Sequence, residues 1–188
     1  MLSLVTERRQ QILDTAAELF AERGFHGVSV HDIGAACGIS GPALYKHFSG
    51  KGELLAASLT DISETLLKEG SARAAAAESP GDALDALIDW HVDFALGHPA
   101  LIVVQDREWT NLAAAARRDV RALQLSYIDI WVDTVLALEP AGIDDRATAR
   151  AAVQATFGLL NSTPHSARIK PTTMRALLIE IARRSLTG

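Results

Sequence analysis

The chain has a single cysteine, few aromatic residues and no long hydrophobic run. Cys37 has no second cysteine to pair with, which excludes an internal disulfide and is typical of a protein in the reducing cytoplasm. Because no second cysteine is present to resolve an oxidised thiol, we expect Cys37 to be a small buried residue at a helix end rather than a redox sensor. No apolar run approaches the roughly 20 residues of a membrane-spanning helix, and residues 1–10 lack a signal-peptide core. We therefore expect a cytoplasmic protein with no membrane partner.

Strand-like alternation of polar and apolar residues is also missing. Alanine is abundant, and 48% of the residues are hydrophobic, which favours helices packed on helices. Apolar stripes with helical spacing, punctuated by glycine and proline, predict an all-α fold of about nine helices. Besides a first helix ending at Gly24 and a helix pair within residues 29–48, the expected helices cover about 51–79, 82–96, 100–109, 114–138, 145–160 and 172–186.

The net charge of −5 is unfavourable for a nucleic-acid-binding protein taken as a whole. The acidic residues are unevenly distributed, however. Residues 1–52 hold five basic and five acidic side chains, whereas residues 53–188 hold 13 basic and 18 acidic ones. Residues 38–52 contain two lysines, one histidine and no acid. Because phosphate contacts act over about a Debye length, this N-terminal part can still bind DNA.

Residues 29–48, S-V-H-D-I-G-A-A-C-G-I-S-G-P-A-L-Y-K-H-F, predict two short helices joined by a tight turn. The first helix should stop at Gly38, and Pro42 should lie in the first turn of the second helix. Leu44 and Phe48 are four residues apart and would face the core together. A helix–turn–helix that turns small and polar residues outward has the shape to enter a DNA major groove. The outward residues are expected to be Gly41, Ala43, Tyr45, Lys46 and His47.

The first three helices predict a compact head with its own small core. We expect this head to cover residues 1–52 and to rest on a larger helical body, residues 53–188, because a three-helix unit is marginally stable alone. The expected core of the head contains Phe20, Ile33, Ile39, Leu44 and Phe48.

Three stretches between Arg9 and Leu55 carry specific motifs. They read I-L-D-T-A-A-E-L-F-A-E-R-G-F, V-H-D-I-G-A-A-C-G-I-S and L-Y-K-H-F-S-G-K-G-E-L-L. In combination they resemble the DNA-binding domain of the tetracycline-repressor (TetR) family, while the rest of the chain matches only in helix number and length. The resemblance implies a homodimeric transcription regulator, most often a repressor released from a near-palindromic operator by a small ligand.

The resemblance also implies roles for residues of the helix pair. Tyr45 and His47 would contact DNA phosphates, and Lys51 would reach a phosphate from the start of the fourth helix, which fixes register without reading sequence. Gly41 and Pro42 offer no long side chains, which shifts weight to DNA shape. The alternative is that these residues form a solvated helix face. The expected DNA-binding residues are Ser29, His31, Ser40, Gly41, Pro42, Ala43, Tyr45, Lys46, His47 and Lys51.

Most of the aromatic residues of the body fall in the fifth to seventh helices. Aromatic walls with a few polar groups are typical of a small-molecule pocket, although they also make an ordinary helical core. The resemblance implies an effector pocket among the fourth to seventh helices, and the apolar balance favours a hydrophobic ligand. The candidate pocket residues are Trp90, His91, Phe94, Gln105, Trp109, Tyr127 and Trp131.

The last two helices combine small and apolar residues on adjoining faces. The resemblance implies that these helices pair with their copies in a homodimer, and small residues allow the close approach that such a four-helix interface needs. The alternative is packing within one chain. The candidate interface residues are Ala151, Ala155, Leu159, Leu177, Leu178 and Ile181.

Catalysis and metal binding find little support in the sequence. It offers no nucleophile–base pair or phosphate loop, and His91, His98 and His165 match no metal-ligand spacing. We therefore expect no enzymatic activity, cofactor or metal. The acids at every fourth position from Asp85 to Asp93 indicate a solvated helix face. Two alternatives remain: an all-α small-molecule-binding protein or enzyme without DNA binding, and an architectural DNA-binding protein without an effector.

Overall fold

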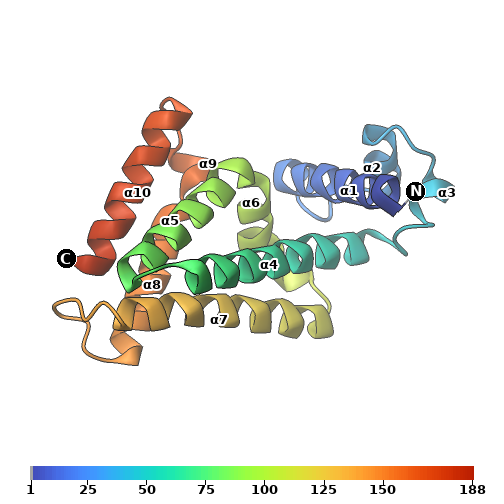
Figure 1. Cartoon of the computed structure of the whole chain (residues 1–188). Coiled ribbons are helices and arrows are strands. Elements are labelled where there is room, and N and C mark those ends of the chain that lie inside the picture. The colour runs from blue at the N-terminus through green and yellow to red at the C-terminus, as the bar shows by residue number, and fades with distance from the viewer. Residues whose placement is uncertain (1) are drawn as a thin grey trace. The chain divides into compact units, whose positions relative to one another are not determined.

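A computed structural model describes residues 2–188, with side chains described from Glu7 onward. Within this range the chain forms helices and no strand, which confirms the all-α prediction (Figure 1). Two of the α-helices, α3 and α9, have only four residues. The elements are α1 (Leu2–Arg23), α2 (Val30–Ala36), α3 (Gly41–Leu44), α4 (Lys51–Ala76), α5 (Pro80–Gly97), α6 (Pro99–Glu108), the 3-10 helix η1 (Trp109–Asn111), α7 (Ala114–Leu136), α8 (Arg146–Leu160), α9 (Thr163–Ser166) and α10 (Pro171–Thr187).

The chain divides into two compact units. Unit 1 comprises Met1–Ile62 and Ala100–Val120, and unit 2 comprises Ser63–Pro99 and Arg121–Gly188. Helices α4 and α7 each contribute residues to both units. The domain boundary between residues 52 and 53 stays a prediction.

Among the described residues, no single helix is both long and apolar enough to cross a membrane. Helix α5 taken together with α6 and η1 reaches that length and composition, but a bend separates α5 from the other two.

Unit 1 is built around the predicted core of the head. Phe20 and Ile33 are completely buried, as is Leu44, and Phe48 is 2% exposed. Ile39 is half-buried and packs against this cluster. The core also takes in residues from far along the chain, because α6, η1 and the first turns of α7 pack against the same side chains. These additional residues are Val104, Leu112 and Val120.

In unit 2, α10 packs along α5 and α8 (Figure 1). The acidic positions of α5 face α10 and form ion pairs with it. Arg175 Nε donates to Asp93 Oδ1 at 2.8 Å and Arg175 Nη2 to Asp89 Oδ1 at 3.1 Å. Arg183 Nη1 lies 3.0 Å from Asp85 Oδ2. The expected solvated face is therefore also the face that binds α10 electrostatically, although such exposed pairs stabilise a protein by only about 0–1 kcal/mol each.

Candidate nucleic-acid interface

Helix α2 begins with a complete capping box. The Ser29 side chain accepts a hydrogen bond from the Asp32 backbone N–H at 3.1 Å, and the Asp32 carboxylate accepts one from the Ser29 backbone N–H at 2.8 Å. The hydrogen bonds that the Ser29 side chain and, to a smaller extent, the Ser29 backbone N–H donate to Asp32 hold the pKa of this carboxylate below its usual value. Ser29 therefore fixes the start of α2, and its hydroxyl is engaged within the protein.

The turn between α2 and α3 follows the predicted pattern. Cys37 caps α2, and Gly38 takes a φ of +66°, a left-handed conformation that costs glycine little. Ser40 is the N-cap of α3, with Pro42 in the first turn. Leu44 is then buried against the core of unit 1. The sequence prediction of a helix–turn–helix in residues 29–48 is confirmed in its turn and its buried face.

Tyr45, Lys46 and His47 lie just beyond the last regular residue of α3. Backbone hydrogen bonds from the Lys46 and His47 N–H groups continue the coil as a tighter turn before Phe48 returns to the core. Tyr45 is 56% exposed, and Lys46 and His47 are also exposed. These three side chains are therefore all exposed, as predicted, and offer one hydroxyl, one ammonium and one imidazole to a partner.

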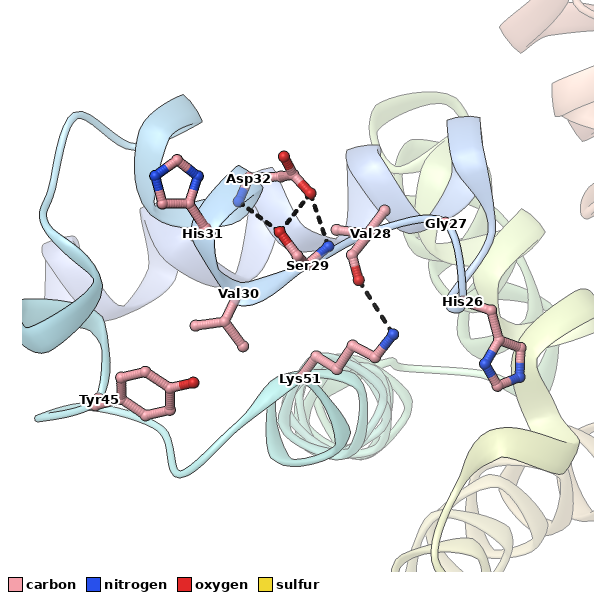
Figure 2. A pocket seen from close by; sticks show the side chains of 9 residues that line it. All are labelled: His26, Gly27, Val28, Ser29, Val30, His31, Asp32, Tyr45 and Lys51. Atoms are coloured by element: carbon pink, nitrogen blue, oxygen red, sulfur yellow. Dashed lines mark hydrogen bonds between the residues drawn. The ribbon is translucent and has the colours of Figure 1, made fainter.

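An open recess of about 530 Å³ lies beside Tyr45 (Figure 2). Figure 2 shows the hydroxyl of Tyr45 turned toward the recess, which Lys51 borders from the other side. His31 projects from the first turn of α2. The recess is lined by His26, Gly27, Val28, Ser29, Val30, His31, Asp32, Tyr45 and Lys51.

Lys51, at the start of α4, holds the loop between α1 and α2. Its Nζ donates to the carbonyl oxygens of Phe25 at 2.8 Å and Val28 at 3.1 Å, and it lies 4.4 Å from the Phe25 ring centre. An ammonium has three N–H donors, so one remains available for an anion in the recess. Lys51 therefore shapes the recess and can also bind an anion within it.

His26 is a recess residue that sequence reasoning missed. Its Nε2 donates to Asn111 Oδ1 at 3.1 Å, and Asn111 Nδ2 donates to the Glu108 carboxylate at 2.7 Å. Glu108 is only 6% exposed. Because His26 and Asn111 are 85 residues apart, no local pattern could have revealed this link.

Unit 2 brings together five aromatic side chains that we call the aromatic cluster. His91 lies at its centre, with ring-centre distances of 4.5 Å to Phe157, 5.5 Å to Phe94 and 5.9 Å to both Tyr127 and Trp131. Phe157 was not among the sequence candidates, because it lies on α8, outside the expected pocket helices. Burial lowers the pKa of His91 to about 4 and raises the pKa of Tyr127.

Two candidate pocket residues lie elsewhere. Gln105 and Trp109 belong to unit 1, where Trp109 packs against the core of the head. Trp90 stays in unit 2, with the Arg73 guanidinium 4.9 Å from its ring centre. The structure therefore brings together Trp90 and the aromatic cluster but not the whole predicted set.

The candidate interface residues on α8 and α10 fall into two groups. Leu177 is 44% exposed and Ile181 39%, and Ala151 and Ala155 are also exposed, with Leu159 half-buried. Leu178, by contrast, is 3% exposed and packs in the core of its own chain. Neighbouring residues of α10 therefore face different sides of the helix. Leu178 packs within its own chain, which is the alternative that the sequence left open.

Comparison with known protein families identifies both halves of the chain. A model of bacterial regulatory proteins of the tetR family matches residues 12–58, and one of tetracyclin repressor-like C-terminal domains matches residues 77–165. Among relatives, the chain is 47% identical over 53 residues to the HTH-type transcriptional activator FasR of Mycolicibacterium smegmatis. This match covers 28% of the chain and only 24% of FasR.

Longer matches extend beyond the head. The chain is 29% identical over 139 residues to the HTH-type transcriptional repressor KstR2 of Mycobacterium tuberculosis, covering 70% of the chain and 66% of KstR2. A solved TetR-family regulator from Bordetella parapertussis shares the fold, with a TM-score of 0.80 at 24% identity over 93% of each chain. The relatives named here are regulators, in agreement with the prediction that the chain is not an enzyme. The chain belongs to the TetR family of transcriptional regulators.

Proposed function

We propose that this protein is a homodimeric transcriptional repressor that a small ligand releases from a near-palindromic operator. The observation that carries this proposal is the exposed group of Tyr45, Lys46 and His47 beside a recess served by Lys51. A hydroxyl, an ammonium group, an imidazole and the remaining N–H of the Lys51 ammonium suit a DNA phosphate backbone. Operator binding would place the protein with the chromosome in the cytoplasm.

Different residues in and beside the helix pair would contact the DNA phosphates and the base edges. Tyr45, His47 and Lys51 would contact phosphates and set the register of the head on DNA. Base edges would meet Ser40, Ala43 and Lys46, with the methyl group of Ala43 suited to thymine. Since α3 starts with Gly41 and Pro42, readout would also depend on groove shape.

Dimerisation would place two heads on the operator. The exposed small and apolar residues of α8 and α10, Ala151, Ala155, Leu177 and Ile181, suit a two-fold interface between copies. Two heads related by such an axis would enter successive major grooves, about one helical turn of DNA apart.

The effector would act through unit 2. Helix α4 begins beside the recess at Lys51 and continues into unit 2, so one continuous helix contributes to the DNA-binding surface and to the proposed ligand-binding unit. A ligand that favours the arrangement unfit for DNA would weaken operator binding, and such coupling typically amounts to about 1–3 kcal/mol. KstR2, which matches 70% of the chain, is named a repressor, whereas FasR, which matches 28% of it, is named an activator.

The test is operator binding measured by fluorescence anisotropy with DNA from the promoter beside the gene. We expect specific affinity that falls steeply with salt, and Tyr45→Ala should weaken it by about tenfold or more without dissociating the dimer. Lys46→Ala should also weaken this affinity, and Lys170→Ala is the matched control for that variant, because Lys170 is an exposed lysine of unit 2. No affinity for this DNA at low salt would overturn the proposal.

A further inference from the structure

Unit 2 buries four polar side-chain atoms that have no hydrogen-bond partner among the described residues. They are Trp90 Nε1, His91 Nδ1, Tyr127 Oη and Trp131 Nε1. Buried polar groups in proteins are nearly always hydrogen-bonded, so each such atom needs an explanation. Three of the four side chains belong to the aromatic cluster, and Trp90 is the direct neighbour of His91.

The four atoms differ in whether they donate or accept hydrogen bonds. The two indole N–H groups can only donate, and the phenol of Tyr127 donates readily. His91 Nε2 is 3.1 Å from Asn161 Oδ1, an acceptor, so Nε2 carries the proton. Because burial keeps His91 neutral near pH 7, its Nδ1 is an acceptor. The group therefore offers three donors and one acceptor.

The surroundings of these atoms are mainly apolar. Tyr127 and Trp131 lie in the hydrophobic core of unit 2 with Leu87, Ile88 and Val153. Burial keeps both His91 and Tyr127 neutral near pH 7. A ligand charge placed beside Tyr127 and Trp131 would lose its hydration, which is strongly unfavourable. The Arg73 guanidinium on the Trp90 ring is exposed to solvent, which screens its charge, so it would compensate little of this loss.

The corner between α4 and α5 is hollowed at the surface of unit 2. An open recess of about 470 Å³ is lined there by Arg73 and Ala86, among others. The same Arg73 covers the ring of Trp90. Tyr127 packs directly on Gly70 of α4, where a Cβ would lie 2.5 Å from Tyr127 Cε2. A glycine at this position thus lets Tyr127 approach α4 closely, which sets the position of its hydroxyl.

We propose that this site binds an uncharged, mainly apolar molecule whose carbonyl or similar oxygen accepts hydrogen bonds from Tyr127, Trp131 and Trp90. His91 accepts a hydrogen bond when the ligand also carries a hydroxyl. This inference rests on the proposed function, since it makes this molecule the effector. It assigns the ligand class from the donors that the chain itself presents.

Tryptophan fluorescence tests the proposal directly, because two of the three tryptophans belong to the site. In a Trp109→Phe background, the remaining emission reports on Trp90 and Trp131. The probes share one skeleton: benzylacetone is a neutral ketone, butylbenzene lacks an acceptor and phenylbutyrate is an anion. We expect benzylacetone to bind about tenfold more tightly than the other two, the equivalent of one good hydrogen bond.

Conservative variants then identify the donors. Tyr127→Phe removes one hydroxyl and should abolish most of the preference for benzylacetone while butylbenzene binding persists, which shows that the variant is folded. Tyr45→Phe, the same change at the exposed tyrosine of unit 1, should leave the preference for benzylacetone over butylbenzene unchanged. Equal binding of benzylacetone and butylbenzene, tighter binding of phenylbutyrate, an unchanged preference in Tyr127→Phe, or no spectral response to any probe would overturn the assignment.

Operator binding by the ligand-free Trp109→Phe protein separates this inference from the proposed function. Loss of specific DNA binding in both this variant and the unmodified protein would count against the proposed function. Intact DNA binding without a preference for the ketone would count against the ligand class alone.

Discussion

His26 donates a hydrogen bond from Nε2 to Oδ1 of Asn111 across 3.1 Å. This contact joins the loop before α2, which lines the recess, to the η1 turn at the end of α6. Asn111 is in turn held by the buried carboxylate of Glu108 at 2.7 Å. One amide therefore fixes the orientation of a histidine on the proposed DNA-binding surface from a segment far away in the sequence.

Replacing Asn111 with alanine should release His26 and weaken operator binding by about three- to tenfold, which corresponds to one hydrogen bond of about 1 kcal/mol. The loss arises because the imidazole is no longer held at the edge of the recess. Anisotropy titrations with operator DNA measure the effect. Asn161→Ala is the matched control, since the other asparagine of the chain holds His91 in unit 2. Equal losses in both variants would contradict a specific role for Asn111.

Lys46 and Lys51 should respond differently to substitution. Lys46→Ala removes an exposed charge, so we expect weaker operator binding, a salt slope reduced by about one and an unchanged Tm. Lys51→Met should lower both affinity and stability, because two backbone carbonyls lose a charged donor. The stability loss should be about 1–3 kcal/mol. Thermal unfolding together with salt-dependent anisotropy distinguishes the two, and a Lys51 variant with wild-type Tm would refute the structural part of this assignment.

The head was predictable from local spacing, whereas the division of residues between the two units was not. The separation of four residues between Leu44 and Phe48 predicts that both face the core, and Gly38 predicts the turn. Trp109 has the same local signature as the aromatic cluster, but it packs in unit 1 because α6 and η1 join the core of the head. That choice depends on contacts between segments some 80 residues apart, which periodicity does not encode.

A similar limit applies at α10. Leu177 and Leu178 are adjacent and equally apolar, so the sequence cannot tell which one faces outward. A rotation of about 100° between successive helical residues places Leu178 in the core and leaves Leu177 exposed. The orientation of α10 on α5, fixed partly by Arg175, decides the matter.

His91 should make the stability of the protein depend on pH. Its folded pKa of about 4 is below the usual 6.5, so the unfolded chain binds a proton in this range and the folded chain does not. Stability contributed by neutral His91 is therefore present above pH 6.5 and is lost as the pH falls toward 4. Between pH 7 and 5 we expect a loss of about 2 kcal/mol.

Urea unfolding at the two pH values measures this loss. His91→Gln should remove it, because the variant has no titrating group at this position. His98→Gln is the matched control, since His98 is an exposed histidine at the end of the same helix. An identical pH dependence in His91→Gln and the unmodified protein would refute the assignment.

Ile181 and Leu125 offer a matched test of the proposed dimer, because each is 39% exposed and lies in unit 2. Ile181→Glu should bury a charge between the α10 helices of two copies and convert the dimer to a monomer, since an unpaired charge in an apolar interface is strongly unfavourable. The monomer should then lose most of its affinity for a palindromic operator, because only one head can bind at a time. Leu125→Glu introduces the same charge on α7 and should leave both properties unchanged. Sedimentation velocity and anisotropy on the two variants measure the outcome, and a dimeric Ile181→Glu protein with full operator affinity would exclude this face of α10 from the interface.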